Sequence, residues 1–337
     1  MSVRATETLD PTGTPATDDH AAVEDHAVED HAAIEDHAAV DDHAVAGEHP
    51  VSEGVGLTAV LVAAARAIET HRPDALARDP YAEHFVRAVP AAADWPLHPR
   101  DVPAGEADPL WGRLGRYFAL RTRALDDQLL RAVQLGARQV VLLGAGLDAR
   151  AYRLDWPSDC ALYEIDRPEV LAFKQGVLDG IEARPTTPHR VAVGADLRTD
   201  WAQALTAAGF RPDRPTAWLA EGLLLFLPGT AERELFAGVD RLSAPGSTLA
   251  YEAKFGFESA AVRGNPVYTA TRDRTGIDLP ALFDAEPRPD TSADLRAHGW
   301  STTDHTPFEF TRHYGRGPLP EPDDTLAANR WVFAVRP

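Results

Sequence analysis

The sequence predicts an α/β fold in which helices cover both faces of a mostly parallel sheet. Apolar, strand-like runs alternate with helical patterns from residue 139 onward, the order typical of parallel sheets. A glycine-rich turn follows the first of these runs, where a buried strand gives way to a helix. The chain has 337 residues, of which 44% are hydrophobic, so one large domain can bury a sizeable core.

Three helical segments precede the predicted sheet. Residues 58–70 are alanine-rich and amphipathic, which predicts a helix. The run Asp79-Pro80-Tyr81 is expected to open a second, short helix. A loop rich in Pro, Ala and Asp follows at about 89–109, and residues 117–135 then form a long predicted helix that ends at Gly136.

The sheet is predicted from five strand-like runs, at 139–143, 161–165, 191–193, 216–220 and 247–253. Helical patterns lie between them at about 168–180, 200–208 and 229–243. Two later runs, 306–311 and 331–335, are expected to form an antiparallel pair at the sheet edge. The stretch 256–290 has no clear period, and we expect it to be a lid or an insertion in an acceptor pocket.

Composition and charge exclude several classes of protein. The net charge is −19, but residues 1–50 hold thirteen acids against one base, Arg4, which leaves 39 acids and 32 bases in the rest. Because no basic stripe is available for phosphate contacts, we expect no nucleic-acid partner. The chain has one cysteine, Cys160, no apolar run of ~18 residues and an acidic N-terminus. We therefore expect a cytoplasmic protein with no intrachain disulfide and no membrane partner.

Within residues 1–50, the stretch 18–43 repeats a short acidic unit, of which Glu24-Asp25-His26 is an example. The period of five or six residues suits neither a solenoid nor one face of a helix. We expect a disordered, acidic, His-rich tail, and the alternative is metal buffering by its six histidines. Residues 51–337 are then the folded domain, with N-terminal helices at 51–137, a ligand-binding core at 138–255, and the lid and C-terminal strands at 256–337.

The sharpest motif is the turn that contains Gly144 and Gly146, directly after the first predicted strand. Glycines there let the backbone turn tightly and approach a ligand. With Ala149 the turn also matches the dinucleotide pattern G-x-G-x-x-A, so a nicotinamide or flavin cofactor and a turn without any ligand remain alternatives. Asp148 favours a cation, because a carboxylate in this loop would repel a pyrophosphate and would suit the ammonium and sulfonium of S-adenosyl-L-methionine. Its structural alternative is a helix cap.

Acidic residues follow the next three strands, at the edge where open α/β sheets bind ligands. Asp166 lies 22 residues after Gly144 and can accept hydrogen bonds from ribose hydroxyls in either cofactor class. After the third strand, Asp196 can accept from an adenine amine and Leu197 can pack on the ring. Glu221 follows the fourth strand, where a cationic methionine group would be a suitable partner. For Asp196 and Glu221 the alternative is again helix capping.

Several ordered motifs resemble the leucine carboxyl methyltransferase-like family of S-adenosylmethionine-dependent methyltransferases, and its bacterial, actinobacterial branch in particular. They are LLGAGLDARAYRL (142–154), YEIDRPEVLAFK (163–174), GADLRTDW (194–201) and AEGLLLFL (220–227). The resemblance covers about 54–255 well and the acidic tail not at all. It implies a class I methyltransferase (Rossmann-like) fold, a seven-stranded sheet whose last strand is inserted antiparallel.

The resemblance also implies the cofactor-binding residues. Arg121 would pair with the carboxylate of S-adenosylmethionine, and the turn at Gly144 and Gly146 would face its methionine part. Asp148 belongs to the same loop. The ribose, the adenine and the methionine end would lie beside residues that follow the second, third and fourth strands: Asp166, then Asp196 and Leu197, then Glu221.

The acceptor side matches the family less closely. The resemblance implies that Arg198 orients an acceptor carboxylate, a role that suits a guanidinium. Phe226 stands where carboxyl-methylating relatives carry a tyrosine, and their N-terminal lysine has no counterpart, since 58–70 contains only Arg66. Candidate bases by residue type alone are His305, His313, Tyr251 and Glu252.

Together these features predict transfer of a methyl group from S-adenosylmethionine to a carboxylate or hydroxyl oxygen of a small molecule, a secondary metabolite being one such acceptor. No metal ion is assigned to this site, and the oligomeric state is left open. The alternatives are an NAD(P)-dependent oxidoreductase and a non-catalytic protein that senses an adenosyl ligand.

Overall fold

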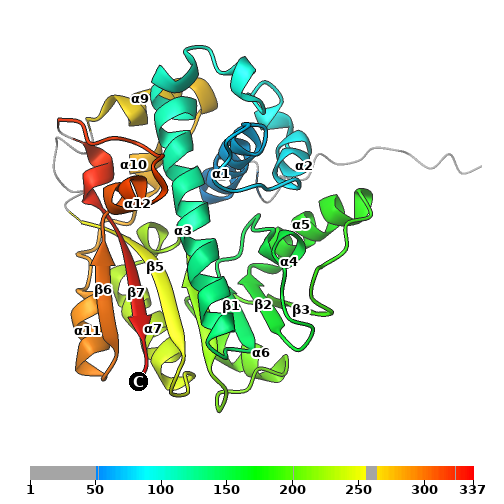
Figure 1. Ribbon diagram of the computed structural model, residues 1–337, viewed down its shortest axis with the longest axis vertical. Helices are drawn as coiled ribbons and strands as arrows, with labels where there is room; N and C mark the ends of the chain where they lie inside the picture. Colours follow the sequence, from blue (N-terminus) through cyan, green and yellow to red (C-terminus); the bar gives the residue numbers. More distant parts are fainter. Residues whose placement is uncertain (1–50, 52, 200, 256–263, 323) are drawn as a thin grey trace, which may run out of the picture. The chain divides into compact units, whose positions relative to one another are not determined.

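The structure is a computed structural model that describes residues 51, 53–199, 201–255, 264–322 and 324–337. The predicted acidic tail at 1–50 lies outside the described residues. The described residues form a seven-stranded sheet in the order β3-β2-β1-β4-β5-β7-β6 (Figure 1). Strands β1 to β5 pair in parallel, and β7 runs antiparallel between β5 and β6. This is the seven-stranded sheet that the resemblance implied, with the last strand inserted antiparallel.

All five predicted parallel strands are confirmed. They are β1 (Gln139–Leu143), β2 (Ala161–Asp166), β3 (His189–Gly194), β4 (Thr216–Ala220) and β5 (Thr248–Lys254). Every residue of β1 and β4 is buried, which explains why these two strands are continuous apolar runs rather than alternating ones.

The prediction for the C-terminal strands is partly wrong. The run at 331–335 belongs to β7 (Asn329–Val335), but β7 lies inside the sheet and β6 (Ser301–His305) forms the edge. The predicted strand at 306–311 is instead helix α12 (Pro307–Tyr314). Thr306 and Glu309 form a capping box, and Pro307 occupies the first helical position, where its missing N–H costs nothing. These capping signals outweigh the alternating pattern.

The helices that pack on the sheet were predicted, and most begin close to their expected residues. They are α1 (Gly54–Thr70), α2 (Ala82–Arg87), α3 (Gly115–Gln134), α5 (Pro168–Gly180), α6 (Trp201–Ala207) and α7 (Gly229–Arg241). The short helix α4 (Arg150–Arg153) follows the glycine turn, and α11 (Thr291–Ala297) precedes β6. Within the described ranges, no helix combines the length and the apolar character needed to cross a membrane.

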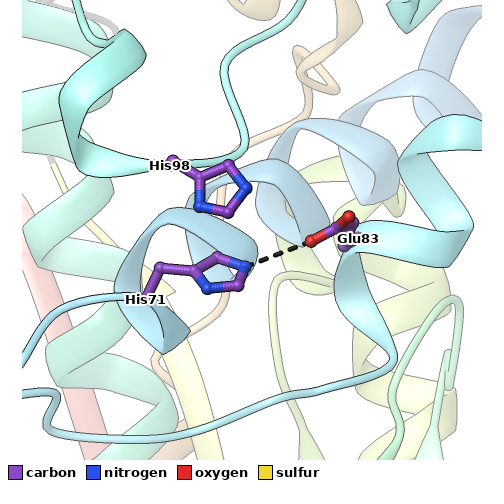
Figure 2. Close-up of side chains that lie close together, drawn as sticks. All are labelled: His71, Glu83 and His98. Carbon is purple, nitrogen blue, oxygen red and sulfur yellow. Dashed lines mark hydrogen bonds and ion pairs between the residues drawn. The ribbon is translucent and has the colours of Figure 1, made fainter.

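Short helical turns fill the remaining segments. They are η1 (Pro90–Ala92), η2 (Pro99–Asp101), η3 (Gly105–Ala107), the π-helical η4 (Pro109–Leu114), η5 (Leu224–Phe226) and η6 (Thr325–Ala328). The described part of the 256–290 stretch forms α9 (Pro266–Thr275) and α10 (Leu279–Leu282). The segment after α1 brings His71, Glu83 and His98 close together (Figure 2).

Two apolar layers cover the two faces of the sheet. On one face Val140 and Leu142 of β1 belong to a cluster with residues of α1, α2, α3 and α5. On the other face Val141 and Leu143 belong to a cluster with residues of α6, α7 and α11. Figure 1 shows α3 lying across the sheet. Helices on both faces, as predicted, leave the carboxyl ends of the strands as the place where polar side chains can meet.

Two helical glycines should respond in opposite ways to the same substitution. A Cβ on Gly238 of α7 would lie 2.6 Å from Cζ2 of the buried Trp201 ring, so Gly238→Ala should lower the free energy of unfolding by about 1–2 kcal/mol. A Cβ on the exposed Gly176 of α5 meets nothing within 4 Å, so Gly176→Ala should raise it by about 0.5–1 kcal/mol. Urea unfolding of both variants measures the difference, and equal effects would contradict the packing of α7 on α6.

Candidate functional site

A cavity of about 510 Å³ lies at the carboxyl ends of β1, β2, β3 and β4. One wall is the first half of α1, and the opposite walls are the loops that follow the four strands. All nine residues expected to contact the cofactor or to orient the acceptor line this cavity: Arg121, Gly144, Gly146, Asp148, Asp166, Asp196, Leu197, Arg198 and Glu221. Residues from five separate segments of the chain therefore meet at one place.

The turn after β1 depends on its glycines. Gly144 and Gly146 have φ angles of +67° and +44°, a region that side chains with a Cβ rarely adopt. A Cβ on Gly144 would also lie 2.9 Å from Cδ1 of Leu223, another residue of the cavity wall. The backbone of this turn can therefore approach a ligand closely only because both positions are glycine.

Asp166 joins the glycine turn to the end of β2. Its Oδ2 accepts the N–H of Gly146 at 2.7 Å, and its Oδ1 accepts the N–H of Arg167 at 2.8 Å. Burial raises the pKa of Asp166 above its ordinary value, and the two backbone hydrogen bonds oppose that rise. Each carboxylate oxygen can accept a second hydrogen bond, so Asp166 can also accept hydrogen bonds from a ligand in the cavity.

Behind the cavity, Glu221 is held by two arginines from different helices. Arg121 of α3 donates from Nε to Glu221 Oε1 at 2.9 Å and from Nη1 to Glu252 Oε2 at 2.7 Å. Arg150 of α4 donates to Glu221 Oε2 at 2.7 Å. Burial alone would raise the pKa of Glu221, but the two guanidinium groups lower it to about 2. Glu221 contacts side chains rather than a helix N-terminus, so the capping alternative for it is wrong.

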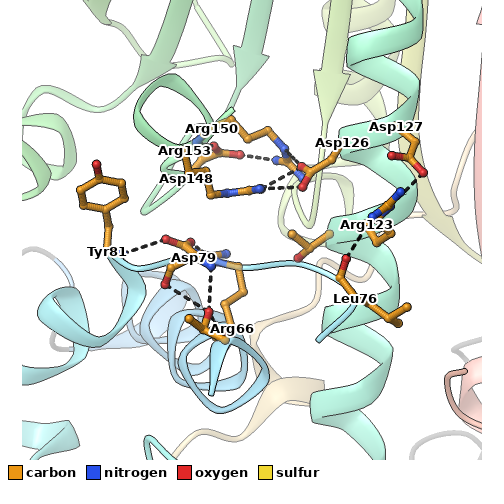
Figure 3. A network of polar contacts seen from close by, with 12 residues as sticks. Arg66, Leu76, Asp79, Tyr81, Arg123, Asp126, Asp127, Asp148, Arg150 and Arg153 are labelled. Carbon is orange, nitrogen blue, oxygen red and sulfur yellow. Dashed lines mark hydrogen bonds and ion pairs between the residues drawn. The ribbon is translucent and has the colours of Figure 1, made fainter. Parts of the chain in front are cut away.

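The network continues through Arg150 (Figure 3). Arg150 donates to Asp148, and its Nε donates to Asp126 of α3 at 2.7 Å. Arg153 donates to the same Asp126 at 2.6 and 2.8 Å. Asp148 also accepts the N–H of Arg150, the first residue of α4, so it both caps this helix and lines the cavity. Burial acts to raise the pKa of Asp148, and Arg150 and, to a lesser extent, Lys174 lower it below its ordinary value.

The directly bonded network holds more acid than base. Its members are four carboxylates, Asp126, Asp148, Glu221 and Glu252, and three guanidinium groups, Arg121, Arg150 and Arg153. Four negative and three positive charges are thus directly bonded, and the buried Lys254, which interacts with Glu252, adds a fourth positive charge. The adjoining pair of Arg66 and Asp79, at 2.8 Å, adds no net charge. The charged residues that line the cavity itself are five acids and four arginines: Glu53, Asp148, Asp166, Asp196 and Glu221, and Arg66, Arg121, Arg167 and Arg198. Because buried charge is costly unless it is balanced, this excess of one negative charge favours a cationic ligand.

At the mouth of the cavity, Arg198 pairs with Asp196. Arg198 Nε donates to both oxygens of Asp196, at 2.9 and 3.1 Å, and the Arg198 N–H donates to Oδ1. The hydrogen bonds from the Arg198 side chain lower the pKa of Asp196 to about 2. Asp196 thus orders the turn ahead of α6, Arg198 stays exposed, and Leu197 between them is buried.

The remaining wall is apolar and partly aromatic. Phe226 lines the cavity, and its ring lies 6.0 Å from the ring of Phe283, which in turn lies 6.3 Å from Tyr268 of α9. The described part of the 256–290 stretch therefore contacts the cavity wall. Val55 and Val62 of α1 line the cavity as well.

Some predicted residues lie elsewhere, and some important ones were missed. Among the described residues, the candidate bases His305, His313, Tyr251 and Glu252 do not line the cavity. Glu252 lies behind Arg121, and His305 pairs with Glu309 at 2.9 Å. Arg150 was missed although it belongs to the quoted glycine motif. Several acids predicted at buried strand ends require a cationic partner, and this requirement could have pointed to Arg150.

The chain is similar to a known protein family, to named proteins and to solved structures. The family model for leucine carboxyl methyltransferase matches residues 59–240. A Streptomyces coelicolor protein, named as an S-adenosyl-L-methionine-dependent methyltransferase, is 63% identical over 287 residues, which cover 85% of this chain and 94% of that protein. A Saccharopolyspora erythraea protein named in the same way is 46% identical over 252 residues, 74% of this chain and 84% of the relative. A solved methyltransferase structure from Thermobifida fusca aligns with a TM-score of 0.47 at 14% identity, over 81% of this chain and 94% of that chain.

The buried network predicts a specific pH dependence of stability. Because the pKa of Glu221 falls to about 2 on folding, its ionised form stabilises the protein above pH 4.5, and this contribution is lost as the pH falls from 4.5 toward 2. Glu221→Gln should therefore be less stable at pH 7 by about 2–3 kcal/mol, and the difference should shrink toward pH 3. Urea unfolding at pH 7, 5 and 3 measures it.

The matched control is Glu169→Gln, which removes an exposed carboxylate that lies 3.3 Å from Arg167. This variant should differ from the unmodified protein by no more than about 0.5 kcal/mol at each pH. A pH-independent effect of Glu221→Gln would show that the carboxylate is not held ionised by the two arginines.

Proposed function

The chain belongs to the leucine carboxyl methyltransferase family, and from that premise we propose that it transfers the methyl group of S-adenosylmethionine to an oxygen of a small-molecule acceptor. The observation that carries the proposal is the meeting of nine family-motif residues around one cavity whose lining holds five acids and four arginines, an excess of one negative charge. S-adenosylmethionine, with an ammonium, a sulfonium and a carboxylate, carries a net positive charge. The positive charge of the cofactor would therefore balance the excess negative charge of the cavity lining.

The residues around the cavity fit the parts of this cofactor. Asp166 would accept hydrogen bonds from the ribose hydroxyls, and Asp196 and Leu197 would frame the adenine. The glycine turn would receive the methionine part, with Glu221 beside it. Arg121 already uses Nε and Nη1 on two carboxylates, so only its Nη2 would remain to pair with the cofactor carboxylate.

When bound, the cofactor supplies a methyl group that an oxygen nucleophile can displace in line: a C–O bond forms, the C–S bond breaks, and the sulfur leaves as a neutral thioether. The protein would contribute alignment and exclusion of water. We favour a carboxylate acceptor, because a carboxyl group with a pKa near ~4 is already ionised at neutral pH, whereas a phenol near ~10 needs a base. No histidine, lysine or tyrosine is among the described residues that line the cavity.

Arg198 is the candidate for orienting such a carboxylate. Its bonds to Asp196 involve Nε and Nη2 and leave Nη1 for a second partner. Because Arg198 is exposed at the cavity mouth, an acceptor could reach it without disturbing the buried network. Phe226 and its aromatic neighbours would then contact the apolar part of the acceptor.

Asp166→Ala should weaken the binding of S-adenosylhomocysteine by about 1–3 kcal/mol, because the ribose hydroxyls lose their acceptor. Isothermal titration calorimetry measures the effect. The control is Asp213→Ala, which removes an exposed acid of the Arg211 pair before β4 and should leave the affinity unchanged. Equal affinity of the two variants would mean that the end of β2 does not contact the ribose.

The product of methyl transfer distinguishes the two oxygen acceptors. With a labelled methyl donor and a panel of aromatic and aliphatic carboxylic acids, we expect products that release labelled methanol in alkali, as methyl esters do. Arg198→Ala should raise the KM for the acceptor and leave the affinity for S-adenosylhomocysteine intact. Products stable in alkali, formed only from phenols, would show ether formation and would remove the proposed role of Arg198.

A further inference from the structure

Two histidines and a glutamate meet at the surface beyond the part of α1 that lines the cavity (Figure 2). His71 directly follows α1, Glu83 belongs to α2, and His98 precedes η2. One ligand atom from each residue lies within 4.8 Å of the other two. His71 Nε2 lies 3.1 Å from Glu83 Oε2, and the two imidazole rings are 3.9 Å apart between centroids.

The backbone that carries these side chains is firmly held. Ile68, Phe85 and Trp95, each within three residues of a donor, are buried in the core. The end of α1 is also tied to the start of α2, because Asp79 accepts from Arg66 at 2.8 Å and its N–H donates to Thr70 Oγ1 at 2.7 Å. The three donors therefore converge on a preformed frame and not on a loose loop.

The hydrogen bonding of the cluster leaves ligand atoms available. In the described part of the chain, the His98 ring is tilted by 34° against the His71 ring and makes no hydrogen bond. Burial acts to raise the pKa of Glu83, but hydrogen bonds with His71 and Arg87 lower it below its ordinary value, so the carboxylate is ionised at neutral pH. Arg87 bonds to Oε1 of Glu83, at 2.8 Å from Nε, which leaves Oε2 directed at the histidines.

We propose that His71, Glu83 and His98 bind a divalent transition-metal ion of the zinc type. Two imidazole nitrogens and one carboxylate oxygen are ligands that zinc takes, with water in a fourth position. Magnesium and calcium prefer oxygen ligands throughout, so this donor set disfavours them. Binding would also give the His98 ring a polar partner, because the ion would join the two imidazoles through one nitrogen of each.

The geometry requires only a local adjustment. Zinc bonds of about 2.0–2.2 Å place tetrahedral donors about 3.4 Å apart, so the widest pair must close by roughly 1–1.5 Å. His71 and Glu83 are partly exposed, with side-chain exposures of 36% and 24%, and can rotate by that amount. Arg87 would orient Glu83 from outside the metal's own ligands, as neighbouring groups do in many metal sites.

The ion would connect the end of α1 to α2 and to the segment before η2. Its three ligands are not among the residues that line the cavity. The ion is therefore expected to change the stability of the fold and not the rate of methyl transfer. An ion that binds only the folded chain raises the melting temperature, and the rise grows with the logarithm of the free ion concentration once that exceeds the dissociation constant. The proposal does not depend on the proposed function.

The test is a calorimetric titration of the full chain with zinc chloride. The chain contains thirteen histidines, six of them within residues 1–50, so any binding by those must be the same in all samples. His71→Ala and His98→Ala are compared with His84→Ala, which removes an exposed histidine of α2 outside the cluster. Melting curves without zinc check that each variant is folded, and Glu83→Gln replaces any variant that is not.

We expect the unmodified protein and His84→Ala to bind one equivalent of zinc more than His71→Ala and His98→Ala. Zinc should also raise the melting temperature of the first two by more than that of the second two. The same number of bound ions and the same affinity in all four proteins, or an equal rise in melting temperature, would overturn the proposal.

Discussion

The pairing of buried carboxylates with arginines at the carboxyl edge of the sheet is the constraint on which the rest of the structure depends. Glu221 follows β4 and Glu252 belongs to β5, while their partner Arg121 comes from α3. Removing one member of such a pair leaves a buried charge without a partner, which is strongly destabilising. The network therefore fixes how α3 and α4 lie on the sheet, and the same contacts shape one wall of the cavity.

The cavity combines exposed backbone at the glycine turn with charged side chains, and both restrict which ligand can bind. The glycine turn, which Asp166 holds through hydrogen bonds from the backbone N–H groups of Gly146 and Arg167, exposes backbone without Cβ atoms at Gly144 and Gly146. The residues that line the cavity carry one negative charge in excess. A ligand that fits both must be able to contact backbone closely and must be cationic. S-adenosylmethionine has these properties, whereas a dinucleotide would bring a diphosphate toward Asp148 and Glu221.

Much of this arrangement could be predicted from the sequence, because parallel strands have an unambiguous apolar pattern and their carboxyl ends carry the polar residues. The errors have physical causes. The segment 306–311 alternates like a strand, but Pro307 and the Thr306–Glu309 capping box start a helix there. Arg150 was overlooked, since its role becomes visible only when the fold brings three carboxylates, Asp126, Asp148 and Glu221, around it. The donors His71, Glu83 and His98 are 12 and 15 residues apart in sequence, a spacing that matches no single helix face or metal-binding motif.

The most direct test of the central claim is a crystal structure of the full chain grown with S-adenosylhomocysteine. We predict that the nucleoside lies between Asp166 and Leu197, with the amino-acid end of the ligand against the glycine turn and Glu221. A cavity that stays free of the ligand while it binds elsewhere, or one in which the ligand's amino-acid end points away from Glu221, would contradict the claim that this charged wall exists to hold the cofactor.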